Sequence, residues 1–378
     1  MMKKLIFLLF LIQTFAFGAD LSYKKYLEDI DSLEEIFRYY CISYEAIQKS
    51  GRFDIDKKIQ ELRNRNVKIL NSDDFFSILC GAFENIPDHH ISFSFLGETY
   101  LLRRKELKTL GKTQPLLLEK ERELYFSFSD FDSEISWKNV RKFENLNMSD
   151  FDKIIFDLRG NSGGDFESGA VILKKLCGLE YEDSDRFAIC EKCLLYGDSP
   201  YYSELKNMLE FSKKEMKKIE KGDVLLKRNP FSRNYLHINK SDSAFTGKIF
   251  VLLDGLTASS AEVFAILLRQ NFKNIKLLGT ESFGAYSYGG VLPAILPNSG
   301  IIINIPQFQT LPGVLQKDNL DPDDGIQPDF QTESIGALLL ALAEDGISEE
   351  IIEMISGNMK QTLINLPNAL AVAVVAVN

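Results

Sequence analysis

The sequence predicts an α/β fold in which parallel strands alternate with helices. Two segments, 154–164 and 250–262, each have the pattern of a short buried strand, a turn of small residues and the start of a helix. A strand at 249–253, a helix at 261–269 and a strand at 276–279 then follow one another as a βαβ unit. Such a unit implies a parallel sheet, because the crossover helix returns the chain to the same edge of the sheet.

The composition is that of a folded globular chain. Of the 378 residues, 45% are hydrophobic and 26% are charged. This length suffices for one large domain with insertions or for several smaller domains. The net charge of −10 at pH 7 argues against a surface that binds nucleic acid.

The N-terminus has the pattern of a signal peptide at residues 1–18. Lys3 and Lys4 precede an apolar run at 5–12, and small residues follow up to Gly18–Ala19, where cleavage is expected. The apolar run is too short for a comfortable membrane span. We therefore expect an exported protein, periplasmic or secreted. An uncleaved membrane anchor is the alternative reading.

Residues 19–87 are predicted as a helical N-terminal region, because apolar residues recur there at helical spacing. Ser72 marks the start of one helix, which is expected to end near residues 86–87. Residues 88–148 follow as a strand-rich linking region, whose segment 137–148 is polar with scattered apolar residues and leads into the next domain. The expected strands lie at 91–95, 116–118 and 124–128.

Residues 149–335 form the predicted α/β core, with an insertion at 178–245. The insertion holds a charged amphipathic helix at 204–221, which fits either a solvated surface helix or a lid that faces substrate. Helices and an apolar tail are expected at 336–378, and the tail itself is too short to span a bilayer.

The chain has five cysteines, so at least one stays unpaired in an oxidising compartment. Cys190 and Cys193 form a single Cys-x-x-Cys, which alone is weak evidence for zinc. A disulfide from Cys177 to Cys190 or Cys193 would close the insertion, and we expect this use of the cysteines rather than a zinc site.

The two strand-to-helix turns are the candidate site. Free backbone N–H groups and the helix dipole converge at such turns in α/β folds. Ser259 stands at the start of the second helix, and Gly163 and Gly164 lie in the first turn. An exposed serine that faces two backbone donors is half of an acyl-transfer site. Taken alone, the same residues also fit a helix N-cap at Ser259 and a tight turn without ligand at the glycines.

Five motifs follow one another in a fixed order along the chain. They are Asp-x-His at 88–90, Asp-Leu-Arg-Gly-Asn-x-Gly-Gly at 157–164, Thr-Ala-Ser-x-Ala-Glu at 257–262, Gly-Thr-x-Ser-x-Gly at 279–284 and Gly-Ile-x-Pro-Asp at 325–329. In this order they resemble the tail-specific or C-terminal-processing serine peptidases, a family that includes the tricorn core protease and the interphotoreceptor retinoid-binding modules. The resemblance implies a ClpP/crotonase-like α/β core with a mixed or parallel sheet and helices, preceded by the helical N-terminal region.

The resemblance also implies site residues. It places the nucleophile at Ser259 and one oxyanion donor at the backbone N–H of Ser260, with the second donor in the Gly163–Gly164 turn. An N–H just after a nucleophile at a helix start points to where the oxyanion forms. In other serine proteases the loss of one such donor costs about 3–4 kcal/mol of transition-state stabilisation.

The base departs from the commonest pattern of the family. Many bacterial members use a lysine in Phe-Gly-Lys, but here Ala285 follows Phe-Gly, and Lys273 and Lys276 have the pattern of surface charges. The resemblance then implies the histidine-using branch, with His90 as general base. Histidine side chains have an ordinary pKa of about 6.5 and can accept the serine proton at neutral pH.

The remaining polar candidates stay open. His89 takes the place of a polar neighbour that helps orient the base, although a helix C-terminal cap or metal binding by the His pair would also fit. His237 is interpreted as a strand residue without a catalytic part. A third group should orient the histidine. The candidates are Asp88, Ser92 and the acidic turn 318–324 with Asp318, Asp321 and Asp324.

The predicted function is an exported serine peptidase that hydrolyses polypeptide substrates through an acyl-enzyme on Ser259. No metal, nucleotide or other cofactor is expected, nor a nucleic-acid partner, nor a stable membrane span after signal cleavage; the oligomeric state is open. The stretch 96–148 is too short for the PDZ domain that family members often carry. The competing class is an inactive member that binds peptides or other ligands, which the missing lysine favours. A non-peptidase hydrolase on the same core is the third reading.

Overall fold

The computed structural model describes residues 20–41, 43–102, 108–110, 114–164, 166–177, 179–182, 235–238, 245–289, 291–306, 308–309 and 324–362. The chain forms two compact units. Unit 1 takes the described residues between 20 and 102 and between 288 and 309, and unit 2 takes the others. The expected signal peptide, the 204–221 helix, the 369–377 tail and the Cys190–Cys193 pair lie outside the described residues.

Unit 1 begins with the predicted helical region, which the structure confirms. Side chains cap three of its helices, because Ser22, Asp54 and Asn71 each accept a hydrogen bond from a backbone N–H of the first turn. The helix from Ser72 ends at Ala82 rather than near residue 86, since the backbone leaves helical geometry at the next residue. The helices are α2 (Tyr23–Tyr40), α3 (Tyr44–Ser50), α4 (Ile55–Arg63) and α5 (Ser72–Ala82).

A four-stranded antiparallel sheet completes the core of unit 1. Its strand order is β13–β14–β3–β4. The strand predicted at 91–95 is β3, and it pairs with β14, which comes from much later in the chain. Aromatic rings fill the space between sheet and helices: Phe37 stacks on Phe83 at a centroid distance of 5.0 Å, and Phe93 meets Phe83 edge-on at 5.5 Å. The strands of unit 1 are β1 (Leu21–Ser22), β2 (Ile69–Leu70), β3 (Ser92–Phe95), β4 (Glu98–Leu101), β12 (Tyr288–Gly289), β13 (Leu292–Ile295), β14 (Ile302–Ile305) and β15 (Phe308–Gln309).

Unit 2 contains the predicted parallel sheet, and the fold class is confirmed. The strand order is β16–β11–β10–β7–β6–β5, and all neighbours are parallel except β5 and β6. The sheet therefore also includes the hairpin at 116–127, which the sequence analysis assigned to the linking region before the core. Its strands are β5 (Leu116–Lys120), β6 (Glu123–Ser127), β7 (Lys153–Asp157), β10 (Lys248–Leu253), β11 (Ile275–Gly279) and β16 (Phe330–Gln331).

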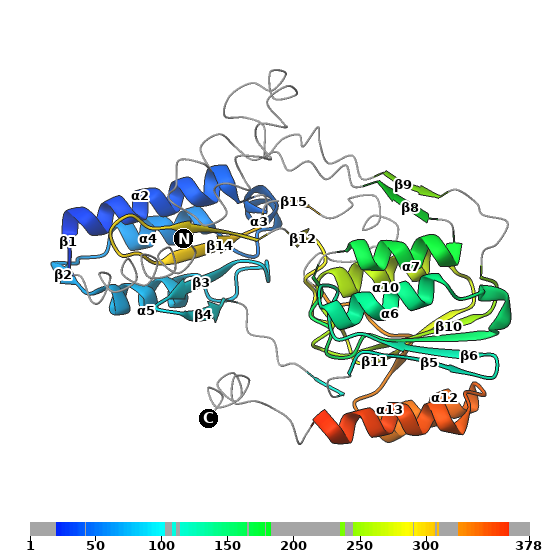
Figure 1. Ribbon diagram of the computed structural model, residues 1–378. Coiled ribbons are helices and arrows are strands. Elements are labelled where there is room, and N and C mark those ends of the chain that lie inside the picture. The colour runs from blue at the N-terminus through cyan, green and yellow to red at the C-terminus, as the bar shows by residue number, and fades with distance from the viewer. Residues whose placement is uncertain are drawn as a thin grey trace, which may run out of the picture. The chain divides into compact units, whose positions relative to one another are not determined.

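Helices cover both faces of this sheet (Figure 1). Alternate strand residues point to opposite sides: Ile154 and Phe156 pack with α6, α7 and α10, whereas Ile155 packs with α12 and α13. Burial on both faces explains why these strands are almost continuously apolar in sequence. The helices are α6 (Glu134–Glu144), α7 (Glu167–Cys177), α10 (Ser260–Asn271), α12 (Ile335–Glu344) and α13 (Glu349–Thr362), and the 3-10 turn η1 spans Met148–Asp150.

Helix α6 corrects one expectation of the sequence analysis. The segment read as a polar lead-in belongs to a helix capped by Ser133, whose side chain accepts from the Ser136 N–H. Val140 and Phe143 bury its inner face. His237 lies in β9 (Tyr235–Ile238), which pairs with β8 (Leu179–Glu182), so its interpretation as a strand residue is confirmed. Within the described ranges, none of the helices combines the length and the apolar character that a membrane crossing requires.

Candidate active site

The two turns named by the sequence lie side by side at one edge of the sheet of unit 2. Strands β7 and β10 are adjacent and parallel, with Asp157 opposite Leu252, so the chain leaves both strands at the same edge. Hydrogen bonds join the turns directly. The Ala258 N–H donates to the Asn161 carbonyl at 2.9 Å, and the Thr257 hydroxyl donates to the Leu158 carbonyl at 2.9 Å.

Ser259 has an unusual backbone conformation at the point where α10 begins. Its φ is 54° and its ψ is −122°, and its side chain is partly exposed. Ser259 is the N-cap residue of α10 and shares a capping box with Glu262, but its dihedrals are not the extended ones that an N-cap residue ordinarily has. A non-glycine residue held at such angles stores strain of about 1–3 kcal/mol and persists only where its surroundings impose it.

Gly163 packs directly against this serine. It has φ of 94°, and a Cβ built on it would lie 2.8 Å from both the Ala258 carbonyl oxygen and the Ser259 Cβ. The same Cβ would lie 3.0 Å from the Ser260 nitrogen. Gly164, with φ of 128°, abuts the Asp132 carboxylate in the same way. Gly163 is thus required by its dihedral angle and by its close approach to backbone atoms, whereas Gly164 is required by its dihedral angle.

The two N–H groups of the glycine turn differ in their hydrogen bonding. The Gly163 N–H donates to the Asn161 Oδ1 at 2.9 Å, and the Gly163 carbonyl accepts from the Phe131 N–H at 2.9 Å. A trans peptide directs the next N–H opposite to that carbonyl, so the Gly164 N–H points away from Phe131. Among the described residues, neither the Gly164 N–H nor the Ser260 N–H has a hydrogen-bond partner. These two amides are the available donors beside Ser259.

The turn rests on a buried charged pair that the sequence analysis did not interpret. Arg159 is fully buried and binds the Asp157 carboxylate through Nε at 2.8 Å and Nη2 at 2.6 Å. The Tyr125 hydroxyl donates to the same carboxylate at 2.8 Å. Burial lowers the pKa of Arg159, but the adjacent Asp157 outweighs it and the net pKa is raised, so the guanidinium stays charged. This pair fixes the start of the turn.

Asp254 anchors the second turn to the first. Its carboxylate accepts from the Gly160 N–H at 2.9 Å, the Leu256 N–H at 3.0 Å and the Leu110 N–H at 3.0 Å. Burial raises the pKa of Asp254, and these three amides oppose the effect. The carboxylate therefore acts as a structural clamp on backbone donors.

His90 lies in unit 1, on the turn that precedes β3. Its backbone N–H donates to the Asp88 Oδ1 at 2.9 Å, and its ring Nδ1 lies 3.5 Å from the same oxygen. The Asp88 side chain is 1% exposed, and its Oδ2 has no partner among the described residues. Burial foremost, and the nearby Asp88 charge next, raise the pKa of Cys41 to about 12.

Of the candidate third groups, Asp88 is the one that accompanies His90. The Ser92 hydroxyl is engaged by the Asn304 amide at 3.1 Å. Asp324 is exposed, and Asp318 and Asp321 lie outside the described residues. His90 belongs to unit 1 and Ser259 to unit 2.

The lysine position of the common dyad is occupied by a buried alanine. The Ala285 N–H donates to the Glu262 carboxylate at 2.7 Å, and its side chain faces the interior. Lys276 is exposed and binds both carboxylate oxygens of Asp345 at 2.7 Å, while Lys273 is exposed. The interpretation of both lysines as surface charges is confirmed.

Glu262 is a further residue of this site whose role the sequence analysis missed. Its carboxylate lies under the Ser259 backbone, fully buried. The signal in the sequence was the spacing Ser-x-x-Glu at the start of a helix, which is the pattern of a capping box. The predicted disulfide of Cys177 stays a prediction; its thiol donates to the Leu173 carbonyl at 3.1 Å.

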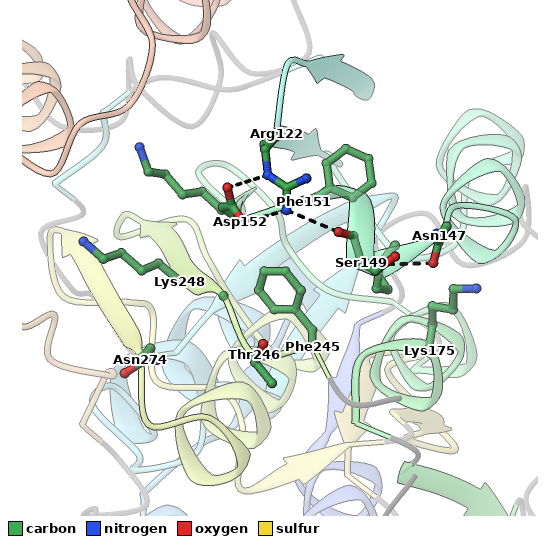
Figure 2. A pocket seen from close by; sticks show the side chains of 13 residues that line it. Arg122, Asn147, Ser149, Phe151, Asp152, Lys175, Phe245, Thr246, Lys248 and Asn274 are labelled. Atoms are coloured by element: carbon green, nitrogen blue, oxygen red, sulfur yellow. Dashed lines mark hydrogen bonds and ion pairs between the residues drawn. The ribbon is translucent and has the colours of Figure 1, made fainter. Parts of the chain in front are cut away.

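A cavity of about 690 Å³ lies elsewhere in unit 2 (Figure 2). Lys153 and Lys248, which begin β7 and β10, line it, so it opens at the amino ends of the strands, whereas Ser259 follows a carboxyl end. The Arg122 guanidinium is already bound by Asp152 at 2.6 and 2.8 Å. Figure 2 shows Lys175 and Lys248 extending to opposite sides rather than converging. This cavity is therefore separate from the candidate site.

Comparison with solved structures shows the fold. Mature CPAF complexed with lactacystin aligns at a TM-score of 0.56 and 13% identity, over 89% of this chain and 99% of that one. Mature CPAF alone aligns at a TM-score of 0.53 and 13% identity, over 82% of this chain and 92% of that one. A comparison with curated protein sequences found no match.

The family profile gives the identification. The profile of peptidase family S41 matches residues 124–332, which is more than half of the 378 residues. The match contains the glycine turn, Ser259 and Glu262, and it begins after His90. The chain therefore belongs to peptidase family S41 and is a serine-type peptidase.

Proposed function

We propose that this peptidase is of the tail-specific, C-terminal-processing type and cleaves polypeptides through an acyl-enzyme on Ser259. The observation that carries the proposal is the packing of the glycine turn against the serine: Gly163 leaves no room for a Cβ beside Ser259. In that arrangement the N–H groups of Gly164 and Ser260 are the donors for the oxyanion. Preorganised backbone donors of this kind supply much of the rate of acyl transfer.

His90 is the proposed general base, assisted by Asp88. A base must remove the Ser259 proton and later protonate the leaving amine. The lysine of the common dyad is absent at Ala285, and His90 sits in the Asp-x-His motif of the histidine-using branch. The Asp88 oxygen at 3.5 Å from Nδ1 would favour the tautomer that leaves Nε2 as the acceptor.

Fluorophosphonate labelling of the mature protein tests this proposal. We expect the wild type to be labelled, Ser259→Ala to be unlabelled, and His90→Ala to react roughly 10²–10⁴-fold more slowly. His237→Ala removes the third histidine of the chain and serves as the matched control, with labelling retained. Full labelling of Ser259→Ala would move the nucleophile elsewhere, and full labelling of His90→Ala would remove His90 as the base.

An inactive binding module is the second candidate, and Ala285 is the observation that favours it. A folded wild type that resists labelling and cleaves no peptide, yet binds peptides in a titration, would support this candidate. The retained Ser259, its strained backbone and the two available amides support the enzyme instead.

We also propose that the protein is exported after cleavage near residues 18–19. The charged start, the short apolar run and the small residues before Ala19 support this. N-terminal sequencing of the protein recovered from cell fractions tests it. A mature N-terminus near Ala19 is expected outside the cytoplasm, whereas an intact N-terminus in the membrane fraction would indicate the anchor.

A further inference from the structure

Glu262 receives four hydrogen bonds although it is completely buried. Its Oε2 accepts from the Ser259 N–H at 2.9 Å and the Ala285 N–H at 2.7 Å. Its Oε1 accepts from the Gly284 N–H at 2.7 Å and from the Ser282 hydroxyl. One carboxylate thus ties the nucleophile turn to the turn formed by residues 282–285.

No cation compensates this carboxylate among the described residues, since none of the ion pairs there involves Glu262. Burial raises the pKa of Glu262, and the four donors oppose the effect. An apolar side chain would cost less to bury at this position in a helix that is otherwise apolar on its inner side. Packing alone therefore does not explain a carboxylate at this position, whereas the four donors that it binds do.

The partners include the strained residue itself. The Ser259 carbonyl already accepts from the N–H groups of Glu262 and Val263, as the helix requires. Its own N–H is held by the Glu262 side chain alone among the described contacts. Because φ at Ser259 is positive, relaxation of this bond would let the peptide rotate and move the Ser259 Oγ and the Ser260 N–H together.

We propose that Glu262 is a positioning residue for Ser259: it imposes the strained backbone that aims the nucleophile and the first oxyanion amide. The 282–285 turn is the other fixed point of this clamp, and the Phe283 N–H reinforces it by donating to the Thr257 carbonyl at 2.9 Å. The inference rests on the proposed role of Ser259 and adds a residue that never touches substrate.

Glu262→Gln is the decisive variant. It keeps the size of the side chain but replaces one acceptor oxygen by an NH₂ group, which must face two of the four donors. We expect the maximal rate of fluorophosphonate labelling to fall roughly 10- to 100-fold, as for the loss of a charge-assisted bond. The concentration of probe at half-maximal rate should stay unchanged, because Glu262 contacts only the backbone of the nucleophile.

Asp29→Asn is the matched control. Asp29 is also fully buried and accepts from the backbone N–H groups of Asn298 and Ser299 at 2.8 Å, but it lies in unit 1. We expect a loss of thermal stability of similar kind without a change in the labelling rate of folded protein. If the wild type is labelled, an equal labelling rate of Glu262→Gln would overturn the inference, and so would an equal loss of rate in Asp29→Asn.

A crystal structure of Glu262→Gln separates this inference from the proposed function. A Ser259 φ that relaxes toward negative values supports the positioning role even if the wild type resists labelling, in which case only the proposed function fails. A Ser259 φ that stays near its wild-type value overturns the inference whatever the labelling shows.

Discussion

Gly163 is the residue at which substitution by alanine tests the candidate site most directly. We predict that Gly163→Ala abolishes labelling of Ser259 and destabilises the protein by about 1–3 kcal/mol, because the new Cβ overlaps the Ala258 carbonyl and strains the backbone. Chemical denaturation and fluorophosphonate labelling measure the two effects.

Gly97→Ala controls for the backbone cost alone. Gly97 has φ of 86°, close to that of Gly163, but a Cβ at this position would have no neighbouring atom within 4 Å. We expect a loss of stability with labelling retained. Normal labelling of Gly163→Ala would mean that the glycine turn is not part of the reacting site.

Ser260 has a side-chain contact beside the proposed oxyanion role of its N–H. Its hydroxyl donates to the Gly164 carbonyl and so holds the peptide that follows the proposed second oxyanion amide. We predict that Ser260→Ala slows labelling about 2- to 10-fold, the range of one neutral hydrogen bond. Ser260→Thr keeps the hydroxyl and should label at nearly the wild-type rate. A Thr variant as slow as the Ala variant would contradict a role for this bond.

At the scale of elements, Glu123 joins two strands to the connection between α12 and α13. Its Oε1 binds Lys153 at 2.9 Å and its Oε2 accepts from the Ser348 N–H at 2.9 Å. Burial alone would raise the pKa of Glu123, but these partners outweigh it and the net pKa falls below the ordinary value of 4.5. A carboxylate whose pKa is lowered in the folded state stabilises that state at pH values above its ordinary pKa. This stabilisation is lost as the pH falls through the lowered pKa.

We therefore predict that Glu123→Gln costs about 1–2 kcal/mol at neutral pH and much less in acid. Urea denaturation at neutral pH and at a pH below 4.5, the ordinary value, measures the difference. Glu350→Gln is the control, because the pair that Glu350 forms with Lys120 among the described residues is exposed, and this variant should show little change at either pH. A cost of Glu123→Gln that is the same at both pH values would contradict the linkage.

Element order was largely predictable from the sequence, because buried parallel strands are continuously apolar and helices repeat their apolar residues. The parallel pairing of β10 and β11 follows from the βαβ pattern, whereas the pairing of β7 with β10 was found only in the structure. Helix α6 was missed because its start signal, Ser133, precedes the segment that looked merely polar. The sequence placed Ser259 and the glycine turn in neighbouring turns, as found. It did not distinguish Gly163 from Gly164, because the direction of an amide depends on φ and ψ rather than on residue type.

At the scale of the whole molecule, each unit has its own hydrophobic core. The described core residues around Phe83 all belong to unit 1, and those around Phe264 all belong to unit 2. Within unit 1, the N-terminal helices share their core with strands contributed by residues 292–305. Such a division favours separate unfolding of the units, since cooperativity follows shared packing.

We predict that calorimetry resolves two transitions that core variants shift one at a time. Phe83→Ala removes a ring that packs on Phe37 and Phe93, and Phe264→Ala removes one that meets Phe156 at 5.3 Å. Each should cost about 3–5 kcal/mol in its own unit. Phe83→Ala should lower one melting temperature and Phe264→Ala the other. A single transition that both variants lower equally would show that the two cores unfold as one block, because a loss in either would then be shared by the whole chain.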